Sequence, residues 1–348
     1  MQKIGVIEGF FGPQWPEQDR LNYATFLSRF GGDFYIYAPK QDAFLRKAWR
    51  DQWPAEYLEK LKNLISTFHS QNVEFGVGFS PFGLGEALNQ EDISHLRAKL
   101  KILSDLKIDM LGLFFDDMPI TANLAATQLS VLNLVKNNFG GKIIFCPSFY
   151  SYDPILDKVF GQRPENYLEE IANGTPLNVS IAWTGPKVIS PVIDVEHLRE
   201  VNTLLKRKPF IWENFFANDG PRNCKFLKLK PLTGRDASTF TQVEAIGLNL
   251  MNQSELSKIL FLSSKLVLEG ETPELAFEKA ITVLCSESLK NFLLKHSDDF
   301  LNKGLDNFSS DEKSCFIEEL EAFPEASAKE ISDWLTDKYT VGSECLTD

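Results

Sequence analysis

Short apolar runs alternate with longer amphipathic stretches along the first three quarters of the chain. The short runs are rich in β-branched and aromatic residues, and such runs of roughly four to eight residues predict strands. They are 4–10, 34–38, 74–80, 110–115, 143–146, 178–183, 209–212 and 245–250. Several, such as the LGLFF of 111–115, are apolar without alternation, which is typical of parallel strands buried on both faces.

Amphipathic helices are predicted between these runs. In the stretch 54–71, Leu58, Leu61 and Ile65 recur at spacings of three and four and so share one helix face. The stretches 90–106, 120–139 and 195–208 follow the same pattern. Each strand starts about 30 to 40 residues after the one before it, which is the length of one strand-plus-helix unit.

Eight such units predict an α/β fold, a (β/α)₈ TIM barrel. The alternative is a doubly wound open sheet, which usually has fewer strands and, for a dinucleotide, a Gly-rich phosphate turn after the first one. The GFFG of 9–12 is not that fingerprint, so the barrel is favoured. Strand-like runs stop near residue 254, and 254–269, 273–284, 287–295 and 310–320 read as helices. We therefore predict a catalytic barrel over 1–268 and a small C-terminal helical region over 269–348.

The charge and the cysteine content mainly exclude certain partners and kinds of site. The chain has 36 Lys and Arg against 48 Asp and Glu, a net charge of −12, and its densest basic run is the KRK of 206–208. An acidic chain without a basic stripe argues against nucleic acid or an anionic membrane as a partner. The five cysteines are scattered without a CxxC pair and the four histidines are isolated, so neither a disulfide framework nor a metal site is expected.

The N-terminus reaches a glutamate before any signal-type apolar stretch can form. No apolar run approaches the ~18 residues of a membrane-spanning helix. If Met1 is the true start, a cytoplasmic location is expected.

Polar and aromatic side chains follow most of the predicted strands, whose carboxyl ends share one rim of a barrel. Carboxylates, amides, a tyrosine and tryptophans on one rim suit a sugar, which offers hydroxyl groups and an apolar ring face. The sharpest feature is the pair Asp116-Asp117 directly after LGLFF. Two close carboxylates perturb each other's pKa, so that one can act as an acid while the other stays anionic. The alternative is a helix N-cap plus a solvated aspartate before the helix near Ile120.

Two aspartates from one strand end lie on one side of a bound sugar. Ordinary two-carboxylate glycosidases place these groups on opposite sides of the scissile bond, ~5 Å or more apart. The pair therefore favours the substrate-assisted exception, in which the sugar's own 2-acetamido oxygen is the nucleophile. One aspartate would orient the acetamido N–H, and the other would protonate the leaving oxygen and then activate water.

The motifs GVIEGFFGPQW, YIYAPKQD, FFDDM, WTGPKV and WENFFANDGPR resemble the catalytic domain of family 84 glycoside hydrolases over about 3–258. These are the O-GlcNAcases and related bacterial β-N-acetylglucosaminidases. The resemblance implies a retaining β-N-acetylglucosaminidase of O-GlcNAcase type that works through an oxazoline. Two alternatives stay open: a glycan- or glycosaminoglycan-degrading relative, and a sugar-binding barrel without catalysis, against which the intact aspartate pair and Tyr150 speak.

The resemblance also implies roles for individual residues. Asp116 would hold the acetamido N–H, Asp117 would be the general acid and base, and Tyr150 would bond the oxazoline oxygen. The implied substrate-binding residues are Trp212 and Asn214 at the acetamido pocket, Asp219 at O4 and O6, Gly9 and Lys40 at the outer hydroxyls, Thr184 at the pocket wall, and Asn249.

Some of these assignments compete with others. The family usually shows Asn-Pro where this chain has Asn249-Leu250, and Asn252 is a competitor. Phe149 stands where relatives often carry a polar residue. Outside the family context, Lys40 could pair with Asp42 on the surface and Gly9 could serve a tight turn, while Trp183 and Cys146 are expected in the core.

The expected partner is a glycoprotein or glycan that bears β-linked GlcNAc, and a homodimer is left open. No cofactor is implied, because no NAD, metal or phosphate motif occurs in the sequence.

Overall fold

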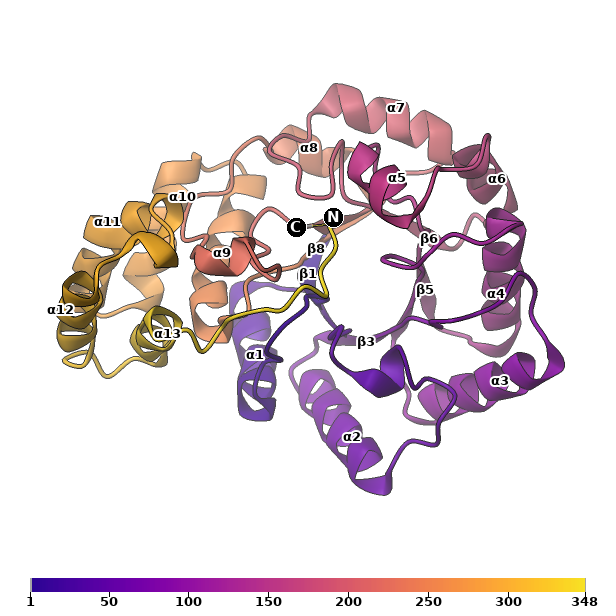
Figure 1. Cartoon of the computed structure of the whole chain (residues 1–348), viewed down its shortest axis with the longest axis horizontal. Helices are drawn as coiled ribbons and strands as arrows, with labels where there is room; N and C mark the ends of the chain where they lie inside the picture. The colour runs from indigo at the N-terminus through magenta and orange to yellow at the C-terminus, as the bar shows by residue number, and fades with distance from the viewer. Residues whose placement is uncertain (1, 348) are drawn as a thin grey trace.

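A closed barrel of eight parallel strands forms the centre of the computed structural model, which describes residues 2–347 (Figure 1). Neighbouring strands pair in sequence order, and β8 closes the barrel onto β1. The strands are β1 Lys3–Glu8, β2 Phe34–Tyr37, β3 Glu74–Phe79, β4 Met110–Phe114, β5 Lys142–Cys146, β6 Ser180–Trp183, β7 Phe210–Glu213 and β8 Ala245–Leu248. The predicted (β/α)₈ barrel is therefore confirmed.

Helices surround the barrel and continue beyond it (Figure 1). They are α1 Glu17–Phe30, α2 Ala55–Ser70, α3 Gln90–Asp105, α4 Leu124–Asn138, α5 Pro154–Phe160, α6 Tyr167–Gly174, α7 Val195–Leu205, α8 Ala237–Thr241, α9 Ser254–Leu268, α10 Pro273–Leu284, α11 Glu287–Asn302, α12 Ser310–Leu320 and α13 Ala326–Leu335, with short 3₁₀ helices at Ala43–Leu45, Asn223–Lys225 and Leu305–Asn307. The helix predicted over 120–139 begins at Leu124, because the chain from 115 to 123 forms the loop that carries the aspartate pair.

A buried ion pair ties α1 to the start of the barrel. Arg20 donates to both carboxylate oxygens of Glu8, from Nε at 2.7 Å and from Nη2 at 2.6 Å, and the hydroxyl of Tyr35 also donates to Glu8. Glu8 is fully excluded from solvent, so these bonds replace the water that the charge loses. This arrangement fixes the end of β1 next to Gly9, the first residue of the candidate site.

The C-terminal helices lie on one side of the barrel (Figure 1). Glu330 in α13 accepts hydrogen bonds from the backbone N–H groups of Glu255 and Leu256, so a buried carboxylate caps the first turn of α9. One hydrophobic core runs from the barrel into these helices. The predicted division between 268 and 269 stays a prediction.

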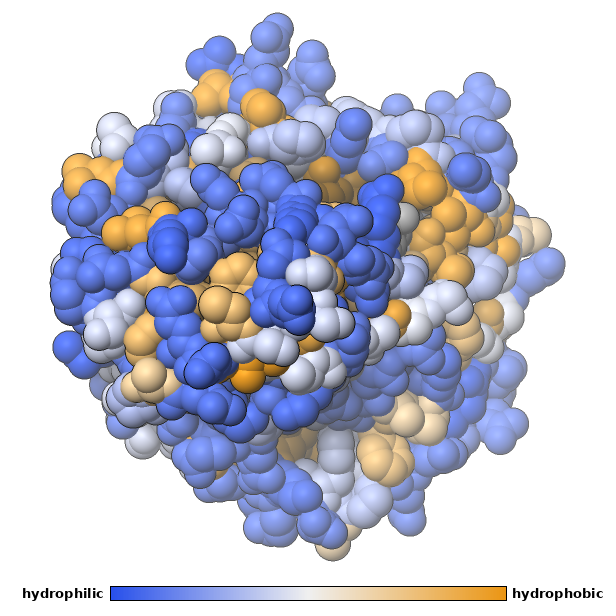
Figure 2. Space-filling model, turned by 60° about the vertical axis from the view of Figure 1, so that its left-hand side comes forward, coloured by the Kyte–Doolittle hydropathy of each residue, from blue (hydrophilic) through white to orange (hydrophobic). Residues whose placement is uncertain are grey.

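Hydrophilic side chains predominate on the face shown in Figure 2, and apolar residues gather in separate patches. Leu177 is the most exposed large apolar residue among those described, at 79%. None of the helices within residues 2–347 is both long and apolar enough to span a bilayer.

Candidate active site

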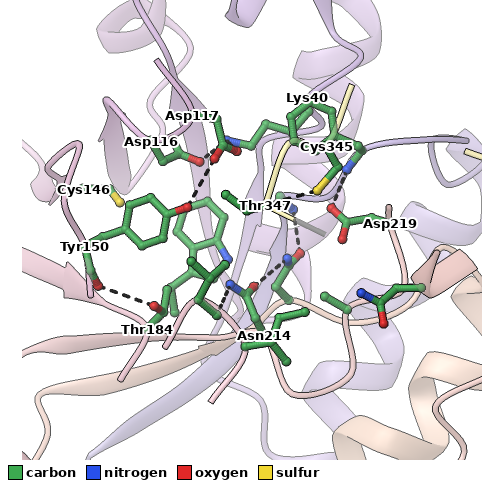
Figure 3. A pocket seen from close by; sticks show the side chains of 18 residues that line it. Lys40, Asp116, Asp117, Cys146, Tyr150, Thr184, Asn214, Asp219, Cys345 and Thr347 are labelled. Atoms are coloured by element: carbon green, nitrogen blue, oxygen red, sulfur yellow. Dashed lines mark hydrogen bonds and ion pairs between the residues drawn. The ribbon is translucent and has the colours of Figure 1, made fainter. Parts of the chain in front are cut away.

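A pocket opens at the carboxyl end of the barrel, where the loops after the strands meet (Figure 3). Each strand except β3 contributes a predicted site residue to the pocket wall, either from the strand itself or from the loop that follows it. The ten predicted residues all line this one pocket: Gly9, Lys40, Asp116, Asp117, Tyr150, Thr184, Trp212, Asn214, Asp219 and Asn249. Their individual roles stay predictions.

The two aspartates reach the same pocket because the backbone turns between them. Adjacent residues of a strand point to opposite faces. Asp117 lies just beyond β4 and has a φ of +53°, in the left-handed region that Asp and Asn adopt more readily than other side-chain-bearing residues. Arg46 donates from Nη2 to the carbonyl oxygen of Asp117 at 2.8 Å, which holds this turn in place. The alternative of a helix N-cap is wrong, because Asn123 occupies that position for α4.

Lys40 pairs with Asp116 in the interior of the pocket (Figure 3). Its Nζ binds Asp116 Oδ2 and lies 3.9 Å from Asp117 Oδ2. A surface pair between Lys40 and Asp42 is therefore wrong, since Asp42 instead accepts hydrogen bonds from the hydroxyls of Tyr37 and Tyr57. The second oxygen of Asp116, Oδ1, is buried and has no hydrogen-bond partner among the described residues.

The environment of Asp117 favours its protonated form. Burial raises the pKa of the Asp117 carboxyl, and the neighbouring Asp116 raises it further. Lys40, Arg46 and a hydrogen bond from Tyr150 oppose this rise without cancelling it. The Tyr150 hydroxyl donates to Asp117 Oδ1 at 3.2 Å, and burial raises the pKa of Tyr150 well above its usual range, so the phenol stays neutral. The pocket thus holds a lysine-paired carboxylate beside a carboxyl group suited to donate a proton.

A chain of amides forms the opposite wall. The N–H of Gly9 donates to Asn249 Oδ1 at 3.2 Å, Asn249 Nδ2 donates to Asn214 Oδ1 at 2.9 Å, and Asn214 Nδ2 donates to the carbonyl of Val188 at 3.0 Å. Asn252 points elsewhere and donates to the carbonyl oxygen of Phe11. Of the two competing asparagines, Asn249 is the one in the pocket.

Trp212 fits against the backbone of Gly9. A Cβ atom at Gly9 would lie 2.3 Å from the Trp212 ring, so only glycine leaves room for the indole. The ring of Phe114 packs edge-on against the same indole, with centroids 4.9 Å apart. Close approach of a side chain, rather than a tight turn, is what requires glycine here.

Asp219 lies on the far side of the pocket from the aspartate pair (Figure 3). Its Oδ2 accepts the backbone N–H of Phe11 at 2.9 Å. Burial raises the pKa of Asp219 to about 6, although hydrogen bonds from the backbone N–H groups of Phe11 and of Asp219 itself oppose the rise. Thr184 joins two strand ends, because its N–H donates to the carbonyl of Tyr150 and its hydroxyl donates to the carbonyl of Lys187.

Three further residues that the sequence singled out, Phe149, Trp183 and Cys146, are all buried. Phe149 points away from the pocket onto the ring of Tyr167, with centroids 5.3 Å apart, so the rim beside Tyr150 is unaffected by it. Trp183 is buried in the core and donates from Nε1 to His197. Cys146 is buried, as expected, and it also lines the pocket.

Sequence reasoning missed several contributors to this pocket. Val188 and Ala217 stand inside motifs that were recognised, and proximity to the motif was the available signal. Arg46, which fixes the turn at Asp117, carries no pattern of its own. Cys345 and Thr347 also line the pocket, although they lie about 100 residues beyond the last strand. No cluster of three or more His, Cys, Asp or Glu side chains suited to a metal occurs within residues 2–347.

Comparisons with known proteins identify relatives of this chain. The family model described as beta-N-acetylglucosaminidase matches residues 4–292. The chain is 32% identical over 254 residues to the protein O-GlcNAcases of Rattus norvegicus and Mus musculus, which covers 70% of this chain and 27% of each relative. The chain thus spans about a quarter of the length of these relatives.

Solved structures share the fold. An O-GlcNAc hydrolase mutant of Thermobaculum terrenum superposes with a TM-score of 0.79 at 28% identity, over 96% of this chain and 80% of that one. CpGH84B superposes with a TM-score of 0.77 over 96% of this chain and 66% of that one, and at 23% identity it supports the fold alone. The family model matches most of the chain, and the aspartate pair lies at the mouth of the barrel. The chain therefore belongs to the β-N-acetylglucosaminidase family of glycoside hydrolases.

Proposed function

We propose that this chain is a retaining β-N-acetylglucosaminidase of O-GlcNAcase type. It removes terminal β-linked GlcNAc, and the sugar's own acetamido oxygen attacks the anomeric carbon to give an oxazoline. Two carboxyl groups with different surroundings in one pocket support the proposal: Asp116 pairs with Lys40, and burial raises the pKa of Asp117.

The observation that carries the proposal is the unpartnered oxygen of Asp116. Lys40 occupies Oδ2, while Oδ1 is buried without a hydrogen-bond partner among the described residues. A buried acceptor left unpaired is costly, and a ligand N–H can satisfy it. An acetamido N–H supplies such a donor. Asp116 would then orient the acetamido group and stabilise the positive charge that develops on its nitrogen in the oxazoline.

Asp117 would carry the proton transfers. Its raised pKa suits a general acid that protonates the leaving oxygen, and the resulting carboxylate then activates the water that opens the oxazoline. Tyr150, which donates to Asp117 before substrate binds, would turn its hydroxyl to the acetamido oxygen as that oxygen attacks. The neutral phenol favours this role, because it keeps a proton to donate.

The remaining residues would hold the sugar. Trp212 and Asn214 would line the acetamido pocket, Asp219 would accept hydrogen bonds from O4 and O6, and Thr184 would form part of the wall. Gly9 and Lys40 would contact the outer hydroxyls, and Asn249 would be a further substrate-binding residue. The amide chain through Asn249 and Asn214 supports this assignment, because it fixes both side chains before the sugar arrives.

Asp219 also offers a different mechanism, since it is a third carboxylate on the opposite side of the pocket. As a direct nucleophile it would form a covalent glycosyl-enzyme. Substrates whose acetyl group carries one, two or three fluorines separate the two mechanisms. If the acetamido oxygen attacks, kcat/KM falls steeply with each fluorine, because fluorine withdraws electron density from that oxygen. A flat series, or a sugar ester trapped on Asp219, would refute the oxazoline route.

The substrate we propose is a GlcNAc-bearing glycoprotein, and the alternative is a free glycan or glycosaminoglycan. The names of the relatives, protein O-GlcNAcase and O-GlcNAc hydrolase, support the first. The test compares kcat/KM for a GlcNAc-modified protein with that for chitobiose, and uses a nitrophenyl β-GlcNAc glycoside to establish that the preparation is active. Preference for the modified protein supports the proposal, and preference for chitobiose would contradict it.

A further inference from the structure

The segment 341–347 returns from the C-terminal helices to the mouth of the barrel. In Figure 1 it is the end of the yellow coil that leaves α13 and passes in front of β1. Its starting point is fixed, since Trp334 in α13 donates from Nε1 to the carbonyl of Cys224 at 2.9 Å. Two distant parts of the sequence are thereby brought to the same rim.

One apolar contact anchors the segment at the rim. Val341 is buried and packs with Phe11 and Cys224 in a small cluster separate from the main core, and the half-buried Cys345 packs against the same cluster. Gly12 makes room for it, because a Cβ there would lie 2.6 Å from the Val341 side chain. Beyond this contact, Glu344 accepts a hydrogen bond from Gln41, and the chain from 342 to 344 is exposed.

The following residues enter the pocket itself. Cys345 and Thr347 line it together with Lys40, Asp117 and Asp219 (Figure 3). The thiol of Cys345 lies 3.8 Å from the Thr347 hydroxyl. Burial raises the pKa of this thiol, and the carboxylates of Asp219 and Asp117 raise it further. The thiol therefore faces the acidic groups as a neutral occupant.

These are the same side chains that the proposed function assigns to the sugar. Asp219 and Lys40 would bind its hydroxyls, and Asp117 would protonate its leaving oxygen. Cys345 and Thr347 line the same space that a sugar bound to these side chains would enter. We propose that residues 341–347 are an intramolecular ligand of the sugar pocket, and that this segment and the sugar bind in mutually exclusive states; the proposal rests on the proposed function.

The segment is held mainly by the apolar cluster around Val341 and by the hydrogen bond between Gln41 and Glu344. Ser343 and Leu346 are exposed, and the neighbouring groove along Arg46 and Pro119 stays open beside them. When only a fraction of molecules has an empty pocket, the apparent dissociation constant of the sugar rises in inverse proportion to that fraction. Weakening the anchor should lower KM for a small glycoside and leave kcat unchanged, because chemistry occurs only in the state without the segment.

The experiment measures alkylation of Cys345 by N-ethylmaleimide, followed by peptide mass spectrometry, with and without saturating N-acetylglucosamine. Cys315 is exposed on α12 and serves as the reference thiol in the same sample. If the sugar displaces the segment, Cys345 labelling accelerates by about threefold or more while Cys315 labelling does not change. If the sugar slows Cys345 labelling or leaves it unchanged, the segment stays in place beside the sugar, and the proposal is wrong.

A second variant tests the anchor directly. Val341→Asp places a charge against Phe11, and Val283→Asp, on an exposed face of α10, is the matched control. We expect Val341→Asp alone to speed Cys345 labelling without sugar and to lower KM for nitrophenyl β-GlcNAc at constant kcat. A higher KM would show that the segment completes the sugar site, which overturns the proposal.

These outcomes are separable from failure of the proposed function. If the wild-type protein neither hydrolyses the glycoside nor gains thermal stability with N-acetylglucosamine, the proposed function itself fails. If it does both and Cys345 labelling does not accelerate, only the intramolecular ligand is refuted.

Discussion

The ammonium group of Lys40 pairs with Asp116 at a place where both side chains are nearly excluded from water, at 4% and 8% exposure. In a buried pair of this kind, each charge makes up for the solvation that the other has lost. Removal of one partner therefore leaves the other as an unpaired buried charge. The pair therefore links the stability of the barrel to its chemistry.

Lys40→Met should lower the free energy of unfolding by about 3–5 kcal/mol, because it leaves the Asp116 carboxylate buried without a partner. Adding Asp116→Asn removes that charge and should restore most of the stability, while activity stays lost. Urea denaturation of the two single variants and the double variant measures the coupling. Additive effects of the two substitutions would mean that the side chains do not interact as described.

The pH dependence of kcat/KM should be bell-shaped. The reaction needs Asp219 ionised to accept hydrogen bonds, so kcat/KM falls as the pH drops below the Asp219 pKa of about 6. It also needs Asp117 protonated, and burial and Asp116 raise the pKa of this carboxyl, so ionisation of Asp117 removes the acid as the pH rises. The substrate is uncharged, and both limbs therefore belong to the enzyme.

Asp116→Asn should move the alkaline limb of this profile. The anionic neighbour raises the pKa of Asp117, and its removal leaves Lys40 at 3.9 Å to act on Asp117 alone. The pKa of Asp117 should fall and the limb should shift to lower pH. A profile that only drops in height, without shifting, would indicate that Asp116 does not act on Asp117 electrostatically.

Asp117→Asn should slow turnover according to the leaving group. Asparagine tolerates the left-handed backbone at this position, so the melting temperature should change little. Poor leaving groups need protonation and should lose far more rate in the first step than activated phenols, which need little. A series of aryl β-GlcNAc glycosides measures this slope, and an equal loss for every member would exclude Asp117 as the acid.

Asp219→Ala should lower kcat/KM by roughly ten- to a few-hundredfold, since a charged hydrogen bond contributes about 1.5–3 kcal/mol and each ~1.4 kcal/mol is a factor of ten. It should also relax discrimination against the C4 epimer, GalNAc, because the carboxylate would read the orientation of O4. The ratio of the two sugars and the Tm are measured on one preparation. A lower Tm with an unchanged ratio would mean that Asp219 only holds the backbone of Phe11.

The barrel and its site were predictable from the sequence for physical reasons. Strands such as β4 are buried on both faces and therefore read as unbroken apolar runs. The site residues stand at strand ends, so the closure of the barrel brings them together without any further information. Chain order alone thus located Lys40, Asp117 and Asn214 on one rim.

The rest depends on contacts that leave no local pattern. The turn at Asp117 is held by Arg46 from another loop, and no spacing predicts that bond. The helix α13 and the return of Cys345 to the pocket depend on long-range packing through Trp334 and Val341. The pairing of Lys40 with Asp116, rather than with nearby Asp42, likewise follows from burial and not from sequence distance.

The left-handed backbone at Asp117 constrains which substitutions evolution can make at this position. Glutamate would keep an acidic group there, but its longer side chain carries the ordinary penalty of a left-handed residue and would overshoot the position of the carboxyl. Asparagine fits the backbone and abolishes the acid. The exchange that the fold accepts most easily is therefore the one that ends the proton transfer, so a lineage could lose the chemistry while its barrel remained intact.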